Sequence, residues 1–334
     1  MIKRILQVFF VGCLFGSGYI GYVIFFSPSL SPSKDLIIPR GASLRSVSDI
    51  LTDEGIVQHP TLFRVLMRIT GGARRVRAGE FRFQEGISLF DTLRTVYSSD
   101  PIVHQITVPE GWTARQIATI LSEAQLVDPD KFLALTFSSA VAIKYKIDQP
   151  TLEGFLFPDT YSFSRIDGEE RIIETMVHRF FNKFKEYEKE MLEKNWTLER
   201  LVTLASIIEK ETGAKEERQT ISSVFHNRLK KKMRLQSDPT TIYGIPNFNG
   251  NLTKADLLRP SPFNTYVIPA LPPSPIANPG MDSLVAALRP ASTDFLYFVS
   301  NNHGTHIFSK TYGDHNRFVT STQKSGRSKK QSKN

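Results

Sequence analysis

The pattern of apolar positions sets one N-terminal segment apart from the rest of the chain. Residues 5–26 contain no charged side chain. As a helix they would span about 33 Å, enough to cross the hydrocarbon core of a bilayer. Lys3 and Arg4 precede them, so the positive-inside rule leaves residues 1–4 in the cytoplasm and the bulk of the chain outside it. We therefore predict a single-pass anchor over residues 5–26 in the cell (inner) membrane, with the catalytic part periplasmic or extracytoplasmic.

A cleaved signal peptide is the alternative for this segment. The apolar run is longer than the core of a typical signal peptide, and no Ala-x-Ala cleavage site follows it. The run also continues well past Cys13, so we expect an ordinary membrane-buried cysteine rather than a lipid attachment site. Residues 27–35 are rich in Pro and Ser and are predicted to be a linker.

Residues 36–149 contain an internal echo. Residues 38–43 (IPRGAS) match residues 108–113 (VPEGWT) at an offset of 70, and a weaker copy starts at Phe83. Each copy predicts a strand end, a Gly turn and a Ser or Thr N-cap that opens an amphipathic helix. Such strand–helix units resemble LysM-like modules, which bind glycan chains. The alternative is a duplicated structural unit that packs on its neighbour.

After residue 150 the spacing of apolar residues predicts a larger mixed domain over residues 150–319. The helical patterns cover residues 169–193, a stretch that runs from Thr197 into residues 205–212, residues 216–232 and residues 281–288. Residues 295–300 and 306–309 are expected to pair as a β-hairpin. The fold class is therefore α/β (α+β): a transmembrane helix, a small LysM-like α/β module and a larger mixed α/β catalytic domain.

Glu209 is the first candidate for chemistry. It follows an apolar stripe at three- and four-residue spacing, made of Leu198, Leu201, Val202, Ala205 and Ile208. A carboxyl at the edge of such a stripe is partly removed from water, tends to keep its proton and can act as a general acid. The alternative is a boundary Glu paired with a nearby Lys or Arg. Glu211 lies about 200° further around the helix, so the two carboxyls are not expected to share one small site.

Two polar segments, residues 235–243 and 261–266, each surround a proline and are predicted to be loops rather than helix interior. Two such loops directed toward one helix-borne Glu would form a substrate cleft. Residues 271–280 are dense in proline and form a stiff connector to the helix over residues 281–288.

Composition and charge exclude several classes of protein. The hydrophobic content of 40% and the 24 Phe residues argue against a disordered chain, and one cysteine excludes an intramolecular disulfide. The net charge of +9 lies mainly at the two ends, since residues 320–334 carry five basic residues and no acidic one. We therefore expect no nucleic-acid partner, and we predict a basic, disordered tail over residues 320–334.

Several motifs in fixed order give the chain a family resemblance over nearly its whole length. They are residues 152–154 (LEG), 158–161 (PDTY), 205–212 (ASIIEKET), 226–229 (HNRL), 236–240 (QSDPT), 261–266 (SPFNTY), 271–280 (LPPSPIANPG) and 308–312 (FSKTY). In this order they resemble the endolytic murein transglycosylases, the MltG or YceG-like family. Phe263 stands where the family usually has Tyr, and Ala270 where it usually has Gly.

The resemblance implies cleavage of the MurNAc–GlcNAc bond inside nascent peptidoglycan strands, leaving 1,6-anhydroMurNAc ends and ending glycan elongation. Glu209 would protonate the leaving oxygen and then accept the proton of the muramyl C6 hydroxyl, which is the nucleophile. The resemblance implies no cofactor and no metal. The substrate-binding candidates are Asn227, Gln236, Asp238, Thr240, Asn264, Tyr266 and Glu153, and the supporting candidates are Glu211 and Thr212. Peptidoglycan strands are the expected substrate and peptidoglycan synthases the expected protein partners.

Two other functions remain open at this stage. His303, His306 and His315 with Asp314 could be zinc ligands of a hydrolase, although His303 and His306 flank a predicted turn rather than a helix face. A noncatalytic, LysM-type peptidoglycan-binding or scaffold protein is the second alternative. In that case Glu209 would be only a boundary ion-pair residue.

Overall fold

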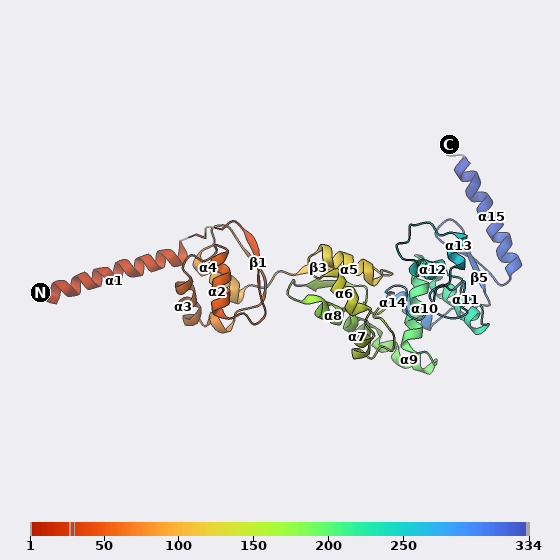
Figure 1. The fold of residues 1–334 in the computed structure, drawn as a ribbon, viewed down its shortest axis with the longest axis horizontal. Coiled ribbons are helices and arrows are strands. Elements are labelled where there is room, and N and C mark those ends of the chain that lie inside the picture. Colours follow the sequence, from red (N-terminus) through yellow and green to blue (C-terminus); the bar gives the residue numbers. More distant parts are fainter. Residues whose placement is uncertain (1, 27, 30, 332–334) are drawn as a thin grey trace. The chain divides into compact units, whose positions relative to one another are not determined.

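The structure is a computed structural model that describes residues 2–26, 28–29 and 31–331 (Figure 1). It divides into two compact units, Met1–Gln105 with Ser162–Gly168, and Ile106–Tyr161 with Glu169–Asn334. The chain therefore passes from one unit to the other more than once. The boundary that we predict between residues 149 and 150 divides the chain by function rather than by compactness, and it stays a prediction.

Helix α1 (Ile2–Phe25) contains the apolar segment. Over Lys3–Phe25 it is long and apolar enough to cross a membrane, and it is the one such helix among the residues that the structure describes. This helix agrees with the predicted residues 5–26 to within one residue at its C-terminal end.

The first unit is a small α/β fold around one antiparallel strand pair. Its elements are β1 (Lys34–Ile38), α2 (Leu44–Asp53), α3 (Pro60–Ile69), η1 (Gly72–Arg74), β2 (Gly79–Phe83) and α4 (Leu89–Ser98). Lys34 pairs with Phe83 and Ile38 with Gly79. The core between the strands and helices is aliphatic and aromatic; it includes Val47, Leu51, Phe63, Met67, Phe81 and Phe83.

A buried ion pair ties the returning segment Ser162–Gly168 into this unit. The Glu80 side chain is 1% exposed, and it accepts hydrogen bonds from Arg165 Nη1 at 2.6 Å and from His104 Nε2 at 2.7 Å. Nearer the surface, Arg40 donates to Asp167 at 2.9 Å. The unit is thus completed by residues that lie far along the chain.

The predicted echo is present in the backbone. Strand β3 (His104–Thr107) and helix α5 (Ala114–Glu123) begin 70 residues after β1 and α2. The glycines between strand and helix have nearly the same left-handed conformation, with φ of 74° at Gly41 and 75° at Gly111. Ser43 and Thr113 then cap the two helices. The weaker copy follows the same plan, with Gly86 at φ 70° after β2 and Ser88 capping α4.

The second unit adds a series of helices to its own copy of the repeat. Along the chain, β4 (Thr160–Phe163) follows α6 (Pro129–Thr136) and α7 (Ser139–Lys144) and pairs with β3. After β4 come α8 (Gly168–Phe184), η2 (Lys185–Tyr187) and α9 (Glu188–Glu193). We predicted one helix over residues 169–193, but the 3₁₀ turn η2 interrupts it. No residue of η2 is buried, so packing does not hold a continuous α-helix there.

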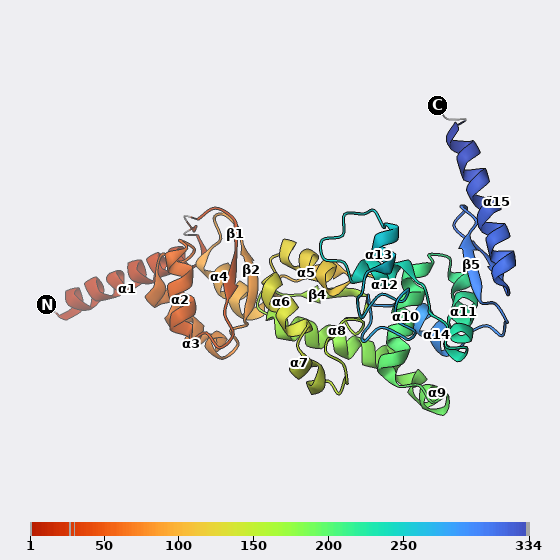
Figure 2. The same cartoon turned by 45° about the vertical axis from the view of Figure 1, so that its right-hand side comes forward.

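Helix α10 (Leu198–Glu211) is the central helix of the second unit. All eight residues from Leu201 to Ile208 are buried, so the helix is enclosed on all sides, whereas we predicted a single apolar stripe. Ser206 is accommodated because its hydroxyl donates to the Thr203 carbonyl and accepts from the Ile276 amide. Both views place α14 (Met281–Leu288) beside α10, and contacts between the two helices agree with this (Figure 2).

The remaining elements are η3 (Lys215–Glu217), α11 (Arg218–Lys230), α12 (Asp238–Tyr243), α13 (Lys254–Leu258), β5 (Tyr297–Ser300), β6 (His306–Ser309) and α15 (Tyr312–Gln331). The predicted hairpin is confirmed, with Tyr297 opposite Ser309. The predicted loop over residues 235–243 is wrong from Asp238 onward. Pro239 lies in the first turn of α12, where a proline removes no needed N–H.

Helix α15 also continues to Gln331, through most of the stretch predicted to be a disordered tail. Its lysines, arginines and glutamines are good helix formers. Residues 332–334 lie outside the described residues.

Candidate active site

Glu209 lies in the last turn of α10, and its side chain is only 6% exposed. Thr197 caps the start of this helix, as predicted. Glu209 Oε1 accepts a hydrogen bond from Arg218 Nη2 at 3.1 Å, and Oε2 accepts one from the Gly280 amide at 3.0 Å. Both oxygens therefore face donors. The ion pair that the alternative interpretation expected is present, with Arg218 as the partner.

Arg218 joins three carboxylates. It is the first residue of α11, and its side chain is 6% exposed. Besides Glu209 it contacts Asp282 Oδ2 at 3.1 Å through Nη1, and Glu110 Oε2 at 3.6 Å through Nη2. Its Nε has no hydrogen-bond partner among the described residues. We call Glu110, Glu209, Arg218 and Asp282 the Arg218 cluster. One buried guanidinium thus contacts carboxylates from three separate parts of the second unit.

The turn at Gly111 is bound directly against Glu209. The Gly111 amide donates to the Asn278 carbonyl at 2.8 Å, and Lys210 Nζ donates to the Gly111 carbonyl at 3.2 Å. A Cβ added at Gly111 would lie 3.3 Å from Glu209 Cγ. A side chain at this position would therefore press against Glu209 and displace it by a few tenths of an ångström.

Glu110 lies on the other side of the same turn, against Gly280. A Cβ added at Gly280 would lie 2.0 Å from Glu110 Oε1, so only glycine allows the carboxyl to approach this backbone. The Glu110 side chain is 43% exposed, far more than that of Glu209. Burial, and then the negative charge of Glu209, raise the pKa of Glu110, while Arg218 opposes them.

Glu153 lies beneath the turn as a fully buried carboxyl. Its Oε1 accepts from the Ala114 amide at 2.9 Å and from Asn278 Nδ2 at 2.8 Å, and its Oε2 accepts from the Tyr243 hydroxyl at 3.2 Å. Burial raises the pKa of Glu153 to about 7. Glu153 thus connects the N-terminus of α5, the Pro-dense connector and α12.

Glu211 has different partners from Glu209. Its carboxyl accepts a short hydrogen bond from the Ser237 hydroxyl, and burial raises its pKa to about 7. Thr212 ends α10, and its hydroxyl accepts from the Ala214 amide at 2.9 Å. Glu209 and Glu211 therefore face separate surroundings, as their angular separation on the helix predicted.

The profile of the YceG-like family matches residues 36–321, which include the whole Arg218 cluster. The chain belongs to the YceG-like family. It is 34% identical over 296 residues to the endolytic murein transglycosylase of Bacillus subtilis, with 84% of this chain and 82% of that protein covered. It is 29% identical to the protein of the same name from Streptococcus pneumoniae, and the match covers 93% of this chain but 63% of the pneumococcal protein.

A crystal structure of a YceG-like protein from Listeria monocytogenes resembles this chain with a TM-score of 0.60. The two sequences are 30% identical, and the match covers 85% of this chain and 98% of the Listeria chain.

In this YceG-like chain the polar motif residues of the two predicted loops bind mainly to one another. Thr240 Oγ1 lies 2.8 Å from Thr265 Oγ1, the Tyr266 hydroxyl donates to Asp238 at 2.6 Å, and Asn264 donates to the Arg259 carbonyl at 2.8 Å. The Ser237 hydroxyl then links this group to Glu211. The two segments therefore contact each other. We predicted that they are directed toward Glu209, but the hydrogen bonds of the described residues join them to Glu211 instead.

Two further motif residues of this YceG-like chain hold backbone segments. Asn227 Nδ2 donates to the Thr293 and Phe295 carbonyls, just before β5. Gln236 Oε1 accepts from Arg228 Nη1 at 3.3 Å. Binding of substrate by these residues stays a prediction.

The histidines of this YceG-like chain lie in separate environments. His306 Nδ1 is 2.7 Å from Glu217, and His315 stacks on the ring of Tyr297. Among the described residues there is no group of three or more His, Cys, Asp or Glu side chains that could hold a metal ion.

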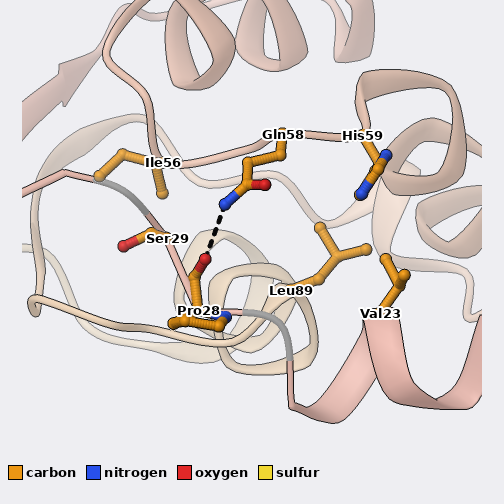
Figure 3. Close-up of a pocket in the computed structure, with 7 residues that line it drawn as sticks. All are labelled: Val23, Pro28, Ser29, Ile56, Gln58, His59 and Leu89. Atoms are coloured by element: carbon orange, nitrogen blue, oxygen red, sulfur yellow. Dashed lines mark hydrogen bonds between the residues drawn. The ribbon is translucent and has the colours of Figure 1, made fainter.

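A small cavity in the first unit is not a candidate for substrate binding. It is lined by Val23, Pro28, Ser29, Ile56, Gln58, His59 and Leu89, and Gln58 Nε2 donates across it to the Pro28 carbonyl (Figure 3). Its volume of about 10 Å³ scarcely holds one water molecule.

Sequence reasoning missed Glu110, Arg218 and Gly280 as site residues. One signal was available for Glu110. Within the echo, position 40 is Arg and position 110 is Glu, a reversal of charge beside the proline and glycine that the two turns share.

Proposed function

We propose that this protein cleaves the MurNAc–GlcNAc bond inside peptidoglycan strands, as an endolytic lytic transglycosylase anchored in the membrane. Its relatives bear the name of this activity, and the enzyme class, a lyase acting on peptidoglycan, follows from the family. The observation that carries the proposal is the buried Glu209 carboxyl, held by Arg218 and the Gly280 amide within a family-specific motif.

The reaction is an intramolecular displacement at C1 of the muramyl residue. The C6 hydroxyl attacks C1, the bond from C1 to the O4 atom of the next GlcNAc breaks, and O4 leaves with a proton. The product is a 1,6-anhydroMurNAc end. Because the nucleophile belongs to the substrate, its proximity replaces the ordered water that a hydrolase needs. Glu209 supplies the carboxylate that accepts the proton of the C6 hydroxyl. In the simplest scheme Glu209 also delivers the proton to O4.

The anchor and the first unit fit a protein that works on new strands at the membrane. Helix α1 is long enough to span the bilayer, with the N-terminus in the cytoplasm by the positive-inside rule. The order β1, α2, α3, β2 with an antiparallel strand pair supports a LysM-like, glycan-binding role for the first unit. As part of the same proposal, the protein acts beside peptidoglycan synthases and ends glycan elongation. Unchanged glycan length in cells that lack the protein would contradict that role.

The test is mass spectrometry of purified peptidoglycan incubated with the full chain in detergent, wild type beside Glu209→Gln. We expect internal cuts with 1,6-anhydro ends for the wild type and at least a 10²-fold loss in the variant. The amide group that this substitution introduces would face two donors, so thermal unfolding and glycan binding must be measured in parallel. Reducing ends would show that water is the nucleophile. A folded, glycan-binding wild type without cleavage would favour the noncatalytic scaffold.

A further inference from the structure

A second carboxyl stands beside Glu209, and the reaction scheme above gives it no role. Glu110 Oε2 and Glu209 Oε1 contact the same nitrogen of Arg218, at 3.6 and 3.1 Å. These two oxygens are therefore no more than about 7 Å apart, which is below the upper limit of about 9.5 Å for paired carboxyls that act on one glycosidic bond.

The two carboxyls differ in what surrounds them. Glu209 is almost fully enclosed, and its two oxygens accept hydrogen bonds from Arg218 and from the Gly280 amide. Among the residues that the structure describes, Glu110 receives only the longer contact from Arg218, and nearly half of its side chain is exposed. The enclosed group is suited to accept a proton, and the open group is suited to deliver one.

The charges that face Glu110 come from four elements. They are Glu209 on α10, Arg218 on α11, Asp282 on α14 and Lys215 in η3. Burial and the two acidic neighbours favour the protonated carboxyl, while Arg218 and Lys215 oppose it, and the resulting pKa is raised. A carboxyl that keeps its proton in this way is suited to act as a general acid.

We propose that Glu110 is the catalytic acid of this site, and that it protonates the leaving O4 atom while Glu209 accepts the proton of the C6 hydroxyl. This inference rests on the proposed transglycosylase function and divides its two proton transfers between two residues. The C1–O4 bond breaks and the C1–O6 bond forms. The Glu110 proton moves to O4, and the C6 hydroxyl proton moves to Glu209. Before the next cycle Glu209 releases its proton to solvent and Glu110 takes one up.

The matched control is a substitution of Arg40, which occupies the corresponding position of the first turn. Arg40 precedes Gly41 as Glu110 precedes Gly111, and its contact is with Asp167 in the first unit. Arg40→Gln therefore alters an equivalent turn without altering the Arg218 cluster.

The test compares two substrates with the full chain in detergent. The first is peptidoglycan. The second is a 4-nitrophenyl glycoside of a GlcNAc–MurNAc chain, whose nitrophenolate leaves C1 without needing a proton. We expect Glu110→Gln to lower kcat on peptidoglycan about 10²-fold with KM unchanged, and to lose the fall in rate that deprotonation of Glu110 causes as the pH rises. On the nitrophenyl substrate it should match the wild type, while Glu209→Gln is inactive on both and Arg40→Gln resembles the wild type on both.

Three results would overturn the proposal. Equal loss on both substrates would make Glu110 structural, and full activity on peptidoglycan would make it irrelevant. Recovery of Glu209→Gln on the nitrophenyl substrate would assign the acid role to Glu209. In each of these cases the transglycosylase function itself would stand. It would fail only if the wild type made no anhydro ends.

Discussion

The turn at residues 38–43 and the turn at residues 108–113 have nearly the same backbone, with left-handed glycines at Gly41 and Gly111 and a capped helix after each. Their surroundings differ. A Cβ at Gly41 would meet nothing within 4 Å, whereas one at Gly111 would meet Glu209. The residue before the glycine is an exposed Arg in the first turn and a member of the Arg218 cluster in the second.

This difference indicates how a duplicated unit can contribute to chemistry without changing its fold. The glycine and the cap specify the turn in both copies. In the second copy the turn is also bound by the Asn278 backbone and supported by Glu153. One reversal of charge, from Arg at position 40 to Glu at position 110, then places a carboxyl beside Arg218. The repeat sets the conformation of the turn, and single positions such as 40 and 110 set its charge.

Of the variants that compare the two turns, Arg218→Met should lower the free energy of unfolding most. The substitution leaves the enclosed Glu209 without its partner, and loss of one member of a buried ion pair costs about 3–5 kcal/mol. Urea unfolding followed by tryptophan fluorescence measures it, because both Trp residues, Trp112 and Trp196, lie in the second unit. Arg40→Met, which breaks an exposed pair in the first unit, should cost less than about 1 kcal/mol by hydrogen exchange. Similar costs for both would mean that Arg218 is not effectively buried.

A slightly smaller effect is expected from Glu153→Gln, and it depends on pH. The folded pKa of Glu153 is about 7 against an ordinary value of 4.5, so the folded chain keeps a proton that the unfolded chain has lost. Stability is therefore highest below about pH 4.5 and falls as the pH rises toward 7, by about 3 kcal/mol for this group.

The glutamine side chain introduced by Glu153→Gln can accept from Ala114 and donate to Tyr243 without titrating. The urea midpoints at pH 5 and pH 8 should therefore lie closer together in the variant than in the wild type. At pH 8 the variant should be more stable than the wild type. Glu211, with a similarly raised pKa, still contributes its own fall. An unchanged difference between the two pH values would contradict the assignment to Glu153.

The smallest change in stability, and the most direct test of the comparison, is the pair Gly41→Ala and Gly111→Ala. Each forces alanine into a left-handed conformation, at a cost of about 1 kcal/mol. Only the second also pushes a methyl group against Glu209, and a displacement of a few tenths of an ångström there should lower kcat about tenfold or more. Equal activity of the two variants would show that the Gly111 turn does not position Glu209.

Local signals in the sequence predicted much of this fold. The caps at Thr197 and Thr113, the glycines of the echo, the helix over residues 281–288 and the hairpin all depend on residues close together in the chain. The sequence does not predict helix α12, because a proline inside a helix usually interrupts it. Pro239 lies in the first turn, where a proline loses no hydrogen bond.

The composition of the site could be predicted only in part. Glu209 was accessible through its helix and its motif. Glu110, Arg218 and Gly280 come from three other segments, and nothing local indicates that a carboxyl at 110 should lie against a backbone at 280. Periodicity shows which face of an element is buried, but it does not show which distant element covers it.

Because Ser162–Gly168 belongs to the first unit, a single break in the chain cannot separate the two units. A truncation at residue 105 would remove β1 and β2 but leave Arg165 without Glu80, and Asp167 without Arg40. The second unit, which contains the Arg218 cluster, therefore could not be joined by recombination to another N-terminal region at a single junction. A transplant that works would have to carry both pieces of the first unit or rebuild residues 162–168. Lineages that exchange this domain should therefore exchange it together with its N-terminal neighbour.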